Sequence, residues 1–465
     1  MMTSWLPDLS RRNGPRYRAI AEALAEDVRE GRLADGARLP THRDLAWKLR
    51  VTIGTVSRAY AEAERRGLIA GEVGRGTYVR HPNDAARVTP GDILGEAALA
   101  DFIDLTINRP TSAGEAAAIA AALQELAAEP DLARLLDYQA PAGSVADRAA
   151  GAALLKRCGL VATPEQIVVT AGGQHAMACV IGALTQPGDS LAAEALTYPG
   201  LRALAGLLQL KLVPIAIDEH GLVPEALEAA CRAAPLRALY TMPTLHNPTT
   251  VTMPATRRQA ISELAERHGL TLIEDDVYGF LLDQPPAPLA HYAPRCGIYL
   301  TSTSKSLMPA LRVGYVRAPE AHVGPIAAAV RATLYSAPPL MARIVARWVA
   351  DGTAERLAAE KRAEMRARNR RARQILAGAE VAGDPAAPHL WLSLPETWRA
   401  DDFAAAARRS GVGIVPAAAF AVTRQAPNAV RICLGAQSAA EQVERGVARL
   451  AALLASPPER YLSIV

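Results

Sequence analysis

Lys305 is the residue of this sequence with the clearest potential for covalent chemistry. It stands in the hydroxyl-rich run Thr301-Ser-Thr-Ser-Lys-Ser, directly after an apolar segment, and Arg312 follows it by seven residues. A lysine among hydroxyl groups and near a guanidinium can be held partly deprotonated, and a neutral amine can form a Schiff base with an aldehyde. It is also one of only five lysines among 51 basic residues. Taken alone, Lys305 is still more easily explained as a surface lysine, so the residues around it decide.

Three other segments carry groups that suit a phosphorylated aromatic ring. Gly172-Gly173-Gln174 follows an expected strand and opens an expected helix, where free backbone N–H groups bind anions. Tyr198, in Thr-Tyr-Pro-Gly, offers a flat ring on which a pyridine can stack. Asn247, in His-Asn-Pro-Thr, offers an amide donor at a strand end.

A carboxylate and a phenol follow another apolar, β-branched run. Asp275 at this strand end suits a protonated pyridine nitrogen, which makes the ring an electron sink. Tyr278 lies three residues on and can hydrogen-bond a phenolic oxygen. Contacts to a phosphate would come from Ser302, Ser304 and Arg312. Each of these residues also has an ordinary structural explanation as a turn, cap or surface residue.

In this order the elements resemble the fold-type I aminotransferases of the aspartate-aminotransferase superfamily, most closely the branch with the kynurenine and 2-aminoadipate aminotransferases. The resemblance is carried by Asn-Pro, Asp-x-x-Tyr, Ser-x-Ser-Lys and the arginine seven residues later, and it extends over about residues 103–434. It implies pyridoxal 5′-phosphate as the cofactor and Lys305 as the catalytic residue that binds it. The implied cofactor-binding residues are Gly172, Gly173, Gln174, Tyr198, Asn247, Asp275, Tyr278, Ser302, Ser304, Lys305, Arg312 and Tyr138.

The resemblance also implies residues for a substrate or effector and for a second subunit. Arg431, in Ala-Val-Arg-Ile-Cys, matches the arginine that grips a substrate α-carboxylate with a bidentate fork. Tyr138, in Tyr-Gln-Ala-Pro-Ala-Gly, matches a tyrosine that reaches the phosphate of the partner subunit, which implies a homodimer. Two positions depart from the family pattern. Asn108 stands where many members have glycine-like residues of the substrate site, and Gln174 replaces a hydroxyl residue of the phosphate turn.

The elements that must position these residues form an α/β pattern from about residue 101 onward. Short β-branched runs alternate with long Ala-rich helical stretches, which favours a mostly parallel sheet. The expected strands are 167–170, 212–215, 238–240, 270–273 and 298–300. Residues 340–465 are expected to form a smaller α+β lobe, with one long helix at 343–377 and strands at 389–392, 413–415 and 430–433.

The N-terminal 80 residues have a different pattern. Three helices are expected at about 15–31, 41–49 and 52–66, with Thr41 and Thr52 as the caps of the second and third. A Gly-rich hairpin follows at about 68–79. Three helices and a hairpin within this length are typical of a winged helix-turn-helix.

This N-terminal module resembles the GntR-type winged helix-turn-helix over 15–80, with turn, recognition helix and wing in order. Short polar residues at the start of the third helix can approach base edges, and Arg58 can reach a phosphate or a guanine. A glycine at the hairpin tip lets the backbone come close to DNA. The expected DNA-binding residues are Arg43, Thr52, Thr55, Arg58, Arg75 and Gly76.

Composition and charge limit the classes of protein that fit. The chain has 465 residues, of which 50% are hydrophobic and 21% charged, as expected for a globular protein of two or three domains. Residues 1–80 hold 15 basic and 10 acidic side chains, whereas the remainder is nearly neutral. A basic N-terminal piece suggests a nucleic-acid partner, although a solvated surface explains the charge equally well.

Cysteine usage and hydropathy point to a cytoplasmic protein with no membrane partner. The five cysteines are scattered and form no CxxC pair, which fits a reducing compartment. The N-terminus lacks the apolar core of a signal peptide, and the apolar stretches are too short or too polar to span a bilayer. No metal site is expected.

A GntR-type head on an aminotransferase-like body resembles the MocR/GabR family of regulators. The expected division is a DNA-binding domain at 1–80, a linker at 81–100 and a cofactor-binding domain at 101–465. The resemblance implies a homodimeric transcription regulator that binds a double-stranded operator and senses pyridoxal phosphate or a small amino compound. The alternative is an active aminotransferase of amino acids with a DNA-binding passenger, and residual transaminase activity is compatible with either.

Overall fold

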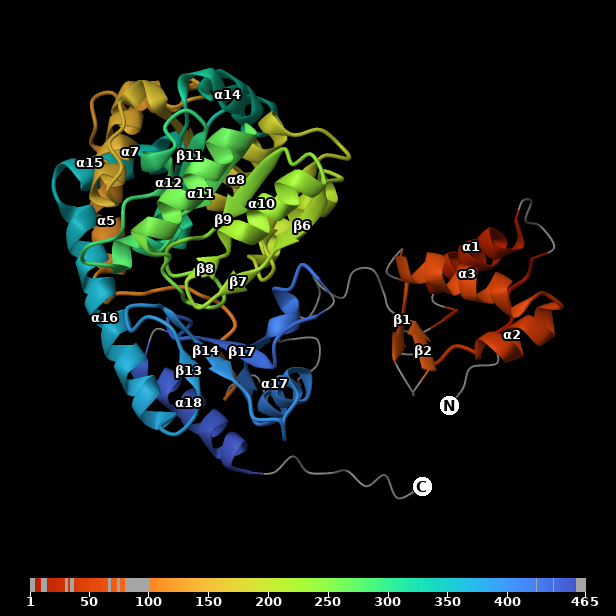
Figure 1. The fold of residues 1–465 in the computed structure, drawn as a ribbon. Helices are drawn as coiled ribbons and strands as arrows, with labels where there is room; N and C mark the ends of the chain where they lie inside the picture. Colours follow the sequence, from red (N-terminus) through yellow and green to blue (C-terminus); the bar gives the residue numbers. More distant parts are fainter. Residues whose placement is uncertain are drawn as a thin grey trace. The chain divides into compact units, whose positions relative to one another are not determined.

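The computed structural model describes residues 5–9, 15–29, 32–33, 37–65, 68–72, 76–79, 101–423, 425–437 and 439–456. The chain divides into two compact units, residues 1–101 and 102–465 (Figure 1). The predicted linker at 81–100 lies outside the described residues.

The N-terminal unit consists of three helices and a hairpin, as the sequence predicts. The helices are α1 (Arg16–Arg29), α2 (His42–Leu49) and α3 (Ile53–Arg65), and the hairpin pairs β1 (Ile69–Glu72) with β2 (Gly76–Val79) in antiparallel register. The core is built from apolar faces of all three helices, with Ile20, Leu24, Leu45 and Val56 almost fully buried.

Two threonine caps fix the start of α2 and α3. The Thr41 hydroxyl accepts a hydrogen bond of 3.2 Å from the backbone N–H of Asp44, and the Thr52 hydroxyl accepts one of 3.2 Å from Thr55. Both caps were predicted, because a threonine side chain satisfies a backbone donor that the first helical turn leaves free. Arg50, in the left-handed region at φ 53°, makes the tight turn between the two helices.

A seven-stranded sheet forms the centre of the larger unit. Its strand order is β4-β12-β11-β10-β9-β5-β6. All neighbours are parallel except that β12 runs antiparallel to both β11 and β4, which confirms the mostly parallel sheet. The sequence pattern does not predict two of these strands, β5 and β12. The bounds are β4 (Ile167–Thr170), β5 (Ser190–Glu194), β6 (Lys211–Ile215), β9 (Ala238–Thr241), β10 (Thr271–Asp275), β11 (Gly297–Ser302) and β12 (Gly314–Arg317).

Helices cover both faces of this sheet, because alternate residues of each strand point to opposite sides. On β4, Val168 packs in the core with α8 and α14, whereas Ile167 and Val169 pack in the core with α7 and α15. The larger helices of this lobe are α5 (Glu115–Ala127), α7 (Val145–Arg157), α8 (Gly173–Leu184), α9 (Pro199–Leu207), α10 (Pro224–Ala233), α11 (Ala255–His268), α14 (Glu320–Leu334) and α15 (Pro339–Ala350). The shorter elements are α6 (Leu132–Leu135), α12 (Leu289–Tyr292), α13 (Thr303–Ser306), the two-stranded pair β7 (Ile217–Asp218) and β8 (Gly221–Leu222), and the 3₁₀ turns η2 (Pro164–Gln166), η3 (Gly279–Leu281) and η4 (Pro309–Leu311).

The carboxyl ends of β4, β5, β9, β10 and β11 lie at one edge of the sheet. The parallel pairs set this direction, and β4 shares it because β12 is antiparallel to both β4 and β11. Ligand sites of open α/β sheets occur at this edge. Every segment in which the sequence predicts a cofactor contact on the large lobe, apart from the one at Tyr138, follows one of these strand ends.

A four-stranded antiparallel sheet of order β13-β14-β17-β16 forms the smaller lobe. Its strands are β13 (Val381–Ala382), β14 (His389–Ser393), β16 (Val415–Pro416) and β17 (Ala429–Cys433), and its helices are α17 (Ala400–Arg409), α18 (Ala440–Ala455) and the 3₁₀ turn η5 (Ala417–Ala419). The prediction of a single strand at 413–415 is wrong. The chain there forms β15 (Val412–Gly413), which pairs with β3 (Ile103–Asp104), and then β16 in the other sheet.

The prediction of one long helix at 343–377 is also wrong, because this segment forms two helices. α15 ends at Ala350, and α16 (Thr353–Ile375) begins after Gly352, which has φ 84°. A left-handed glycine ends a helix at little steric cost. α16 then runs along both lobes (Figure 1), since its Leu357 and Met365 belong to large-lobe cores and its Ala372 to the small-lobe core.

Candidate functional site

A cavity of about 300 Å³ opens at the carboxyl edge of the large sheet. It is lined by every cofactor and effector residue expected from the sequence except Gly172 and Tyr138. Met177, Met242 and Val277 add apolar surface. The expected residues in the wall are Asn108, Gly173, Gln174, Tyr198, Asn247, Asp275, Tyr278, Ser302, Ser304, Lys305, Arg312 and Arg431.

Lys305 projects from α13, the short helix that follows β11. Its ammonium donates a hydrogen bond to the backbone carbonyl of Asn108. Burial lowers the pKa of Lys305 to about 8, with Arg431 acting in the same direction and Cys433 and Asp275 opposing it. A lysine with this pKa is neutral in a far larger fraction of molecules near neutral pH than an ordinary lysine, as an amine that attacks an aldehyde must be.

Asp275 ends β10 with one oxygen satisfied and one free. Tyr240 donates a hydrogen bond of 2.6 Å to its Oδ2, while Oδ1 is buried and has no hydrogen-bond partner among the described residues. Burial raises the pKa of this carboxyl to about 7. A buried acceptor without a donor is costly. The protonated nitrogen of a pyridine ring would supply the missing donor, so this residue fits pyridoxal phosphate.

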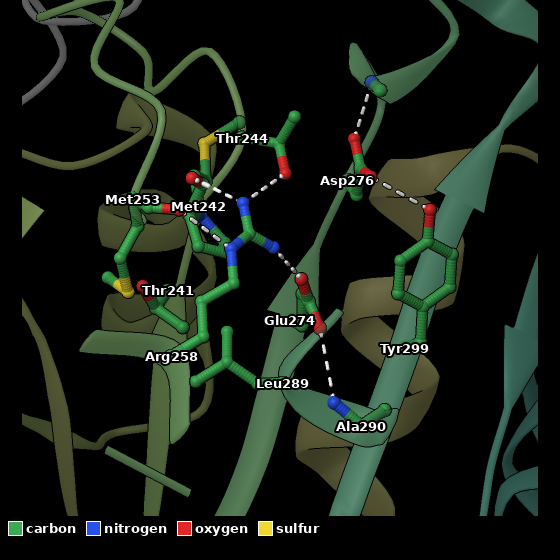
Figure 2. A network of polar contacts seen from close by, with 12 residues as sticks. Thr241, Met242, Thr244, Met253, Arg258, Glu274, Asp276, Leu289, Ala290 and Tyr299 are labelled. Carbon is green, nitrogen blue, oxygen red and sulfur yellow. Dashed lines mark hydrogen bonds and ion pairs between the residues drawn. The ribbon is translucent and has the colours of Figure 1, made fainter. Parts of the chain in front are cut away.

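The two acidic neighbours of Asp275 anchor the strand end (Figure 2). Glu274 forms a fully buried ion pair of 3.2 Å with Arg258, whose guanidinium also donates to the carbonyl oxygens of Met253 and Pro243. Asp276 accepts a hydrogen bond of 2.9 Å from Tyr299. Because Arg258 bonds both β10 and the loop after β9, it fixes the spacing between the segments that carry Asp275 and Asn247.

Tyr278 and Asn108 meet at the side of the cavity. The Asn108 amide donates a hydrogen bond of 2.9 Å to the Tyr278 hydroxyl and lies 3.0 Å from Nδ1 of His389. Burial keeps the pKa of His389 well below its usual value, so its ring is neutral. A neutral Nδ1 accepts from the Asn108 amide, which orients that amide and leaves its Oδ1 as a buried acceptor that no described residue satisfies.

Arg431 enters the cavity from β17 of the small lobe. It donates hydrogen bonds of 2.7 Å to Oδ1 of Asn247 and 2.6 Å to the carbonyl of Thr106, and its guanidinium lies 4.8 Å from the ring centre of Phe420. Its buried Nε has no hydrogen-bond partner in the described chain. The planar group is therefore held by three neighbours and keeps a donor for a carboxylate.

The turn between β4 and α8 has the geometry of an anion site. Gly172 has φ 86°, and a Cβ atom there would lie 2.8 Å from Nη2 of Arg312. The Arg312 guanidinium donates 3.1 Å to the carbonyl of Ala171, and Ser302 donates 3.0 Å to Ser304. Backbone N–H groups at the start of α8, two hydroxyls and one guanidinium would together hold a phosphate.

Tyr198 and Gln174 line the cavity beside this turn. Tyr198 is the N-cap residue of α9, and a Cβ atom on Gly200 would lie 2.2 Å from its ring, so the absent side chain makes room for the phenol. Gln174 donates 3.4 Å to the carbonyl of Gly200 and thereby joins the turn to α9.

Tyr138 does not line the cavity. Its side chain is 79% exposed, and its ring lies 4.5 Å from that of Tyr335. The role expected for it, a contact to the phosphate of a partner subunit, requires such exposure and stays a prediction.

The residues expected to bind DNA lie on α2 and α3. Arg43 is exposed on α2, Thr52 is the exposed residue before α3, and Thr55 is half-buried in the first turn of α3. Arg58 is exposed one turn later, with its guanidinium 5.3 Å from the ring centre of Tyr17.

The wing is described in part. Gly76 begins β2, whereas Arg75 lies outside the described residues. α2 and α3 are held together by a contact of 3.1 Å between His42 Nδ1 and the Ser57 hydroxyl and by a hydrogen bond of 2.9 Å from Tyr60 to the carbonyl of Pro40. The described part of this unit therefore presents a rigid pair of helices with two arginines on its surface.

Sequence reasoning missed the side chains that act behind the cavity wall. Tyr240 and His389 both stand in strands with buried apolar neighbours, where a polar residue demands a partner. That signal was present, but the identity of the partner depends on folding. No group of three or more residues that could hold a metal ion is found in the described ranges. Among the described helices, none has the length and apolarity that crossing a membrane requires.

Comparison with known families divides the chain in the same way. Residues 100–450 match the family "Aminotransferase class I and II", and residues 16–79 match the family "Bacterial regulatory proteins, gntR family". The first match covers the sheet, the cavity and the small lobe. The second covers the three helices and the hairpin.

Individual relatives agree with this division. The chain is 32% identical to the uncharacterized HTH-type transcriptional regulator YdeF of Bacillus subtilis over 97% of each chain. It is 30% identical to the HTH-type transcriptional regulator TauR of Rhodobacter capsulatus over 65% of this chain and 63% of the relative. Among solved structures, an archaeal alanine:glyoxylate aminotransferase is 25% identical, with a TM-score of 0.70 over 78% of this chain and 96% of that one.

Proposed function

The chain belongs to the aminotransferase class I and II family and carries a GntR-family head, and on this premise we propose that it is a transcription regulator that binds pyridoxal phosphate. One observation carries the cofactor assignment. The half-buried Lys305 amine, the unsatisfied Oδ1 of Asp275 and the turn beside Arg312 share one cavity. The HTH-type regulator names of relatives along nearly the whole chain support regulation rather than turnover.

The residues of the cavity have distinct tasks in this proposal. When bound, pyridoxal phosphate supplies an aldehyde and an electron-withdrawing ring. Lys305 would bind the aldehyde carbon through its amine, and the free oxygen of Asp275 would accept a hydrogen bond from the protonated ring nitrogen. Asn247 and Tyr278 bind the ring oxygen, and Tyr198 stacks on the ring. The remaining contacts, to the phosphate, come from Gly172, Gly173, Gln174, Ser302, Ser304 and Arg312.

Arg431 and Asn108 are the proposed effector contacts. Arg431 stands on the small lobe, so a carboxylate that it grips joins that lobe to the large one. An effector changes DNA affinity only through unequal affinity for two states of the protein. A small amino compound with a carboxylate would meet this requirement, because its amine would compete with the Lys305 amine for the cofactor aldehyde while its carboxylate meets Arg431.

A homodimer is part of the proposal. Four large apolar side chains are exposed on two neighbouring segments, with exposed fractions between 41% and 79%. Clustered exposed apolar groups suit burial against another chain. A second copy would bring Tyr138 to the phosphate and two heads to an operator with two half-sites. The four residues are Leu136, Tyr138, Leu334 and Tyr335.

The decisive experiment measures DNA binding and cofactor absorbance on the full-length protein. The DNA is the region upstream of its own gene, at fixed salt, with and without pyridoxal phosphate and a panel of amino acids. We expect a coloured protein whose specific DNA affinity changes with one of these additions. Arg431→Met should keep the absorbance and the DNA binding but lose the response to an amino acid. A change with pyridoxal phosphate alone would identify a sensor of the cofactor itself.

The second candidate function is a working aminotransferase with a DNA-binding passenger. It is favoured by the complete set of Lys305, Asp275, Tyr278 and Arg431 in one cavity. Multiple turnovers with an amino acid and a 2-oxo acid, together with the absence of specific DNA binding, would establish this candidate instead of the regulator. Either function is compatible with the proposed domain bounds, which are 1–80, 81–100 and 101–465. Either is also compatible with the proposed cytoplasmic location.

A further inference from the structure

Lys361 is a buried lysine that the cofactor site does not use directly. It lies on α16, and its side chain has no exposed surface. Its ammonium donates to the backbone carbonyls of Leu307 and, at 3.4 Å, of Lys305, and forms an ion pair of 2.7 Å with Glu115. All three donors of the ammonium therefore have acceptors. Two of these acceptors are the carbonyl oxygens at the end of α13, the helix that carries Lys305.

Arg368 makes the equivalent contact to the other lobe. It lies seven residues later on α16 and is 5% exposed. Its guanidinium donates 2.9 Å to the carbonyl of Leu434 and 2.6 Å to that of Gln437, just after β17. β17 carries Arg431. Seven residues correspond to two helical turns, roughly 10 Å, so both cations project from the same side of one helix.

Between these two contacts α16 is packed tightly against its neighbours. Met365, between the two cations, is fully buried in a large-lobe core, and Asn369 donates 2.9 Å to the carbonyl of Ala387, two residues before β14. A helix with an unbroken hydrogen-bond ladder moves as one body, because interiors are close-packed and resist compression. No other described helix bonds through buried cations to the segments after both Lys305 and Arg431.

We propose that Lys361 is a positioning residue for Lys305, and that α16 couples it through Arg368 to the strand that carries Arg431. Capture of a carboxylate by Arg431 would then shift the backbone that presents the Lys305 amine. This inference rests on the proposed function only for the identity of the ligands, since the coupling itself is a property of the protein.

Lys361 affects Lys305 in two ways, through its hydrogen bonds to the backbone and through its positive charge. Burial is the largest cause of the lowered pKa of Lys305; among charged neighbours, Arg431 and Lys361 lower this pKa further, whereas Cys433 and Asp275 raise it. Loss of the Lys361 charge removes one of the two neighbours that favour a neutral amine. The same substitution therefore has a mechanical effect and an electrostatic effect, which can be measured separately.

Hydrogen exchange on the cofactor-free, full-length protein tests the mechanical coupling. The reporter amides are those of Thr303 and Leu307 near Lys305 and those of Cys433 and Leu434 near Arg431. We expect both Lys361→Met and Arg368→Met to accelerate exchange in both segments, by about tenfold near the mutated contact and less in the other lobe. Lys156→Met and Arg370→Met, which remove exposed cations, are the matched controls and should leave both segments unchanged.

The electrostatic effect is tested on the cofactor-loaded protein. Lys361→Met should raise the pH midpoint of the bound cofactor's visible absorbance, whereas Lys361→Arg, which keeps the charge, and Arg368→Met should leave it near the wild-type value. An unchanged midpoint in Lys361→Met would overturn its action on Lys305. Acceleration confined to the lobe that each variant contacts would overturn the coupling. A wild-type protein that takes up no pyridoxal phosphate would contradict the proposed function, and the exchange experiment would still decide the coupling.

Discussion

The Tyr240 hydroxyl lies 2.6 Å from Oδ2 of Asp275 and supplies the one hydrogen bond that this buried carboxylate receives from a described residue. The two residues stand on neighbouring parallel strands, β9 and β10. The bond fixes the plane of the carboxyl group, and Oδ1 remains available to a ligand. Tyr240 therefore controls the orientation of Asp275 without contacting a ligand through its hydroxyl.

Tyr240→Phe should weaken pyridoxal phosphate binding by about 10- to 100-fold, the range that corresponds to loss of one hydrogen bond to a charged group. The measurement is a titration of cofactor absorbance against concentration. Tyr299→Phe is the matched control, since it removes an equally buried phenol that donates 2.9 Å to the adjacent Asp276 (Figure 2). Equal loss of affinity in both variants would show that the effect is general destabilisation.

Lys305→Ala should abolish the visible absorbance of the bound cofactor and leave the fold intact. The side chain donates only to the carbonyl of Asn108, and its neighbours in α13 keep their own contacts. The measurement is an absorbance spectrum of the purified variant beside its circular dichroism spectrum. Lys211→Ala, at an exposed lysine, should remain coloured. An unchanged spectrum in Lys305→Ala would disprove the assignment.

Glu194 should make the protein less stable as the pH rises from about 4 to 7. This carboxyl is fully buried, and burial raises its pKa to about 7 despite donors from Thr241 and Met242. In the unfolded chain it ionises at about pH 4, so between these values the unfolded state binds fewer protons and is increasingly favoured. Above pH 7 both states are ionised and the penalty is constant.

Glu194→Gln removes this penalty while keeping the shape of the side chain. We expect the variant to equal the wild type near pH 4 and to be more stable above pH 7, by on the order of 3–4 kcal/mol. The measurement is the thermal unfolding midpoint of the cofactor-free protein across this range. Glu225→Gln, at an exposed glutamate, should follow the wild type at every pH. A pH-independent difference between Glu194→Gln and the wild type would contradict the assigned titration.

Arg58→Ala should weaken operator binding by about 1–3 kcal/mol if its guanidinium reads a base. The side chain is exposed on α3 and is steered by the ring of Tyr17. Affinities for operator and for unrelated DNA at one salt concentration distinguish base reading from a phosphate contact, which would weaken both. Arg232→Ala removes the same charge from α10 of the body and should bind like the wild type. Wild-type affinity of Arg58→Ala would exclude it from the recognition surface.

The sequence predicts much of the cavity wall because many of those residues lie at or shortly after strand ends, and the ends of parallel strands meet at one edge of the sheet. Gly173, Asn247, Asp275 and Lys305 are all of this kind. It predicts the supporting residues poorly. Tyr240 lies 35 positions from Asp275, and His389 lies 281 positions from Asn108. Such pairs form only when the topology is complete.

The two wrong predictions of secondary structure, the helix at 343–377 and the strand at 413–415, have a common cause. Helical periodicity continues across Asp351 and Gly352, so the pattern alone indicates one helix, whereas packing of α15 on α7 and of α16 along both lobes requires a change of direction. The run 413–415 has strand composition throughout, but its two ends pair with β3 and β17, which belong to different sheets. In both cases the tertiary partners override the local pattern.

Gly172 sets a constraint on the evolution of this turn. Its φ of 86° disfavours any side chain, and the Arg312 guanidinium occupies the space that a Cβ atom would need. The restriction comes from the backbone conformation first and from the movable Arg312 side chain second, and not from a ligand. In related chains, position 172 should therefore remain glycine even where the arginine at 312 has been replaced, because the backbone conformation alone disfavours a side chain.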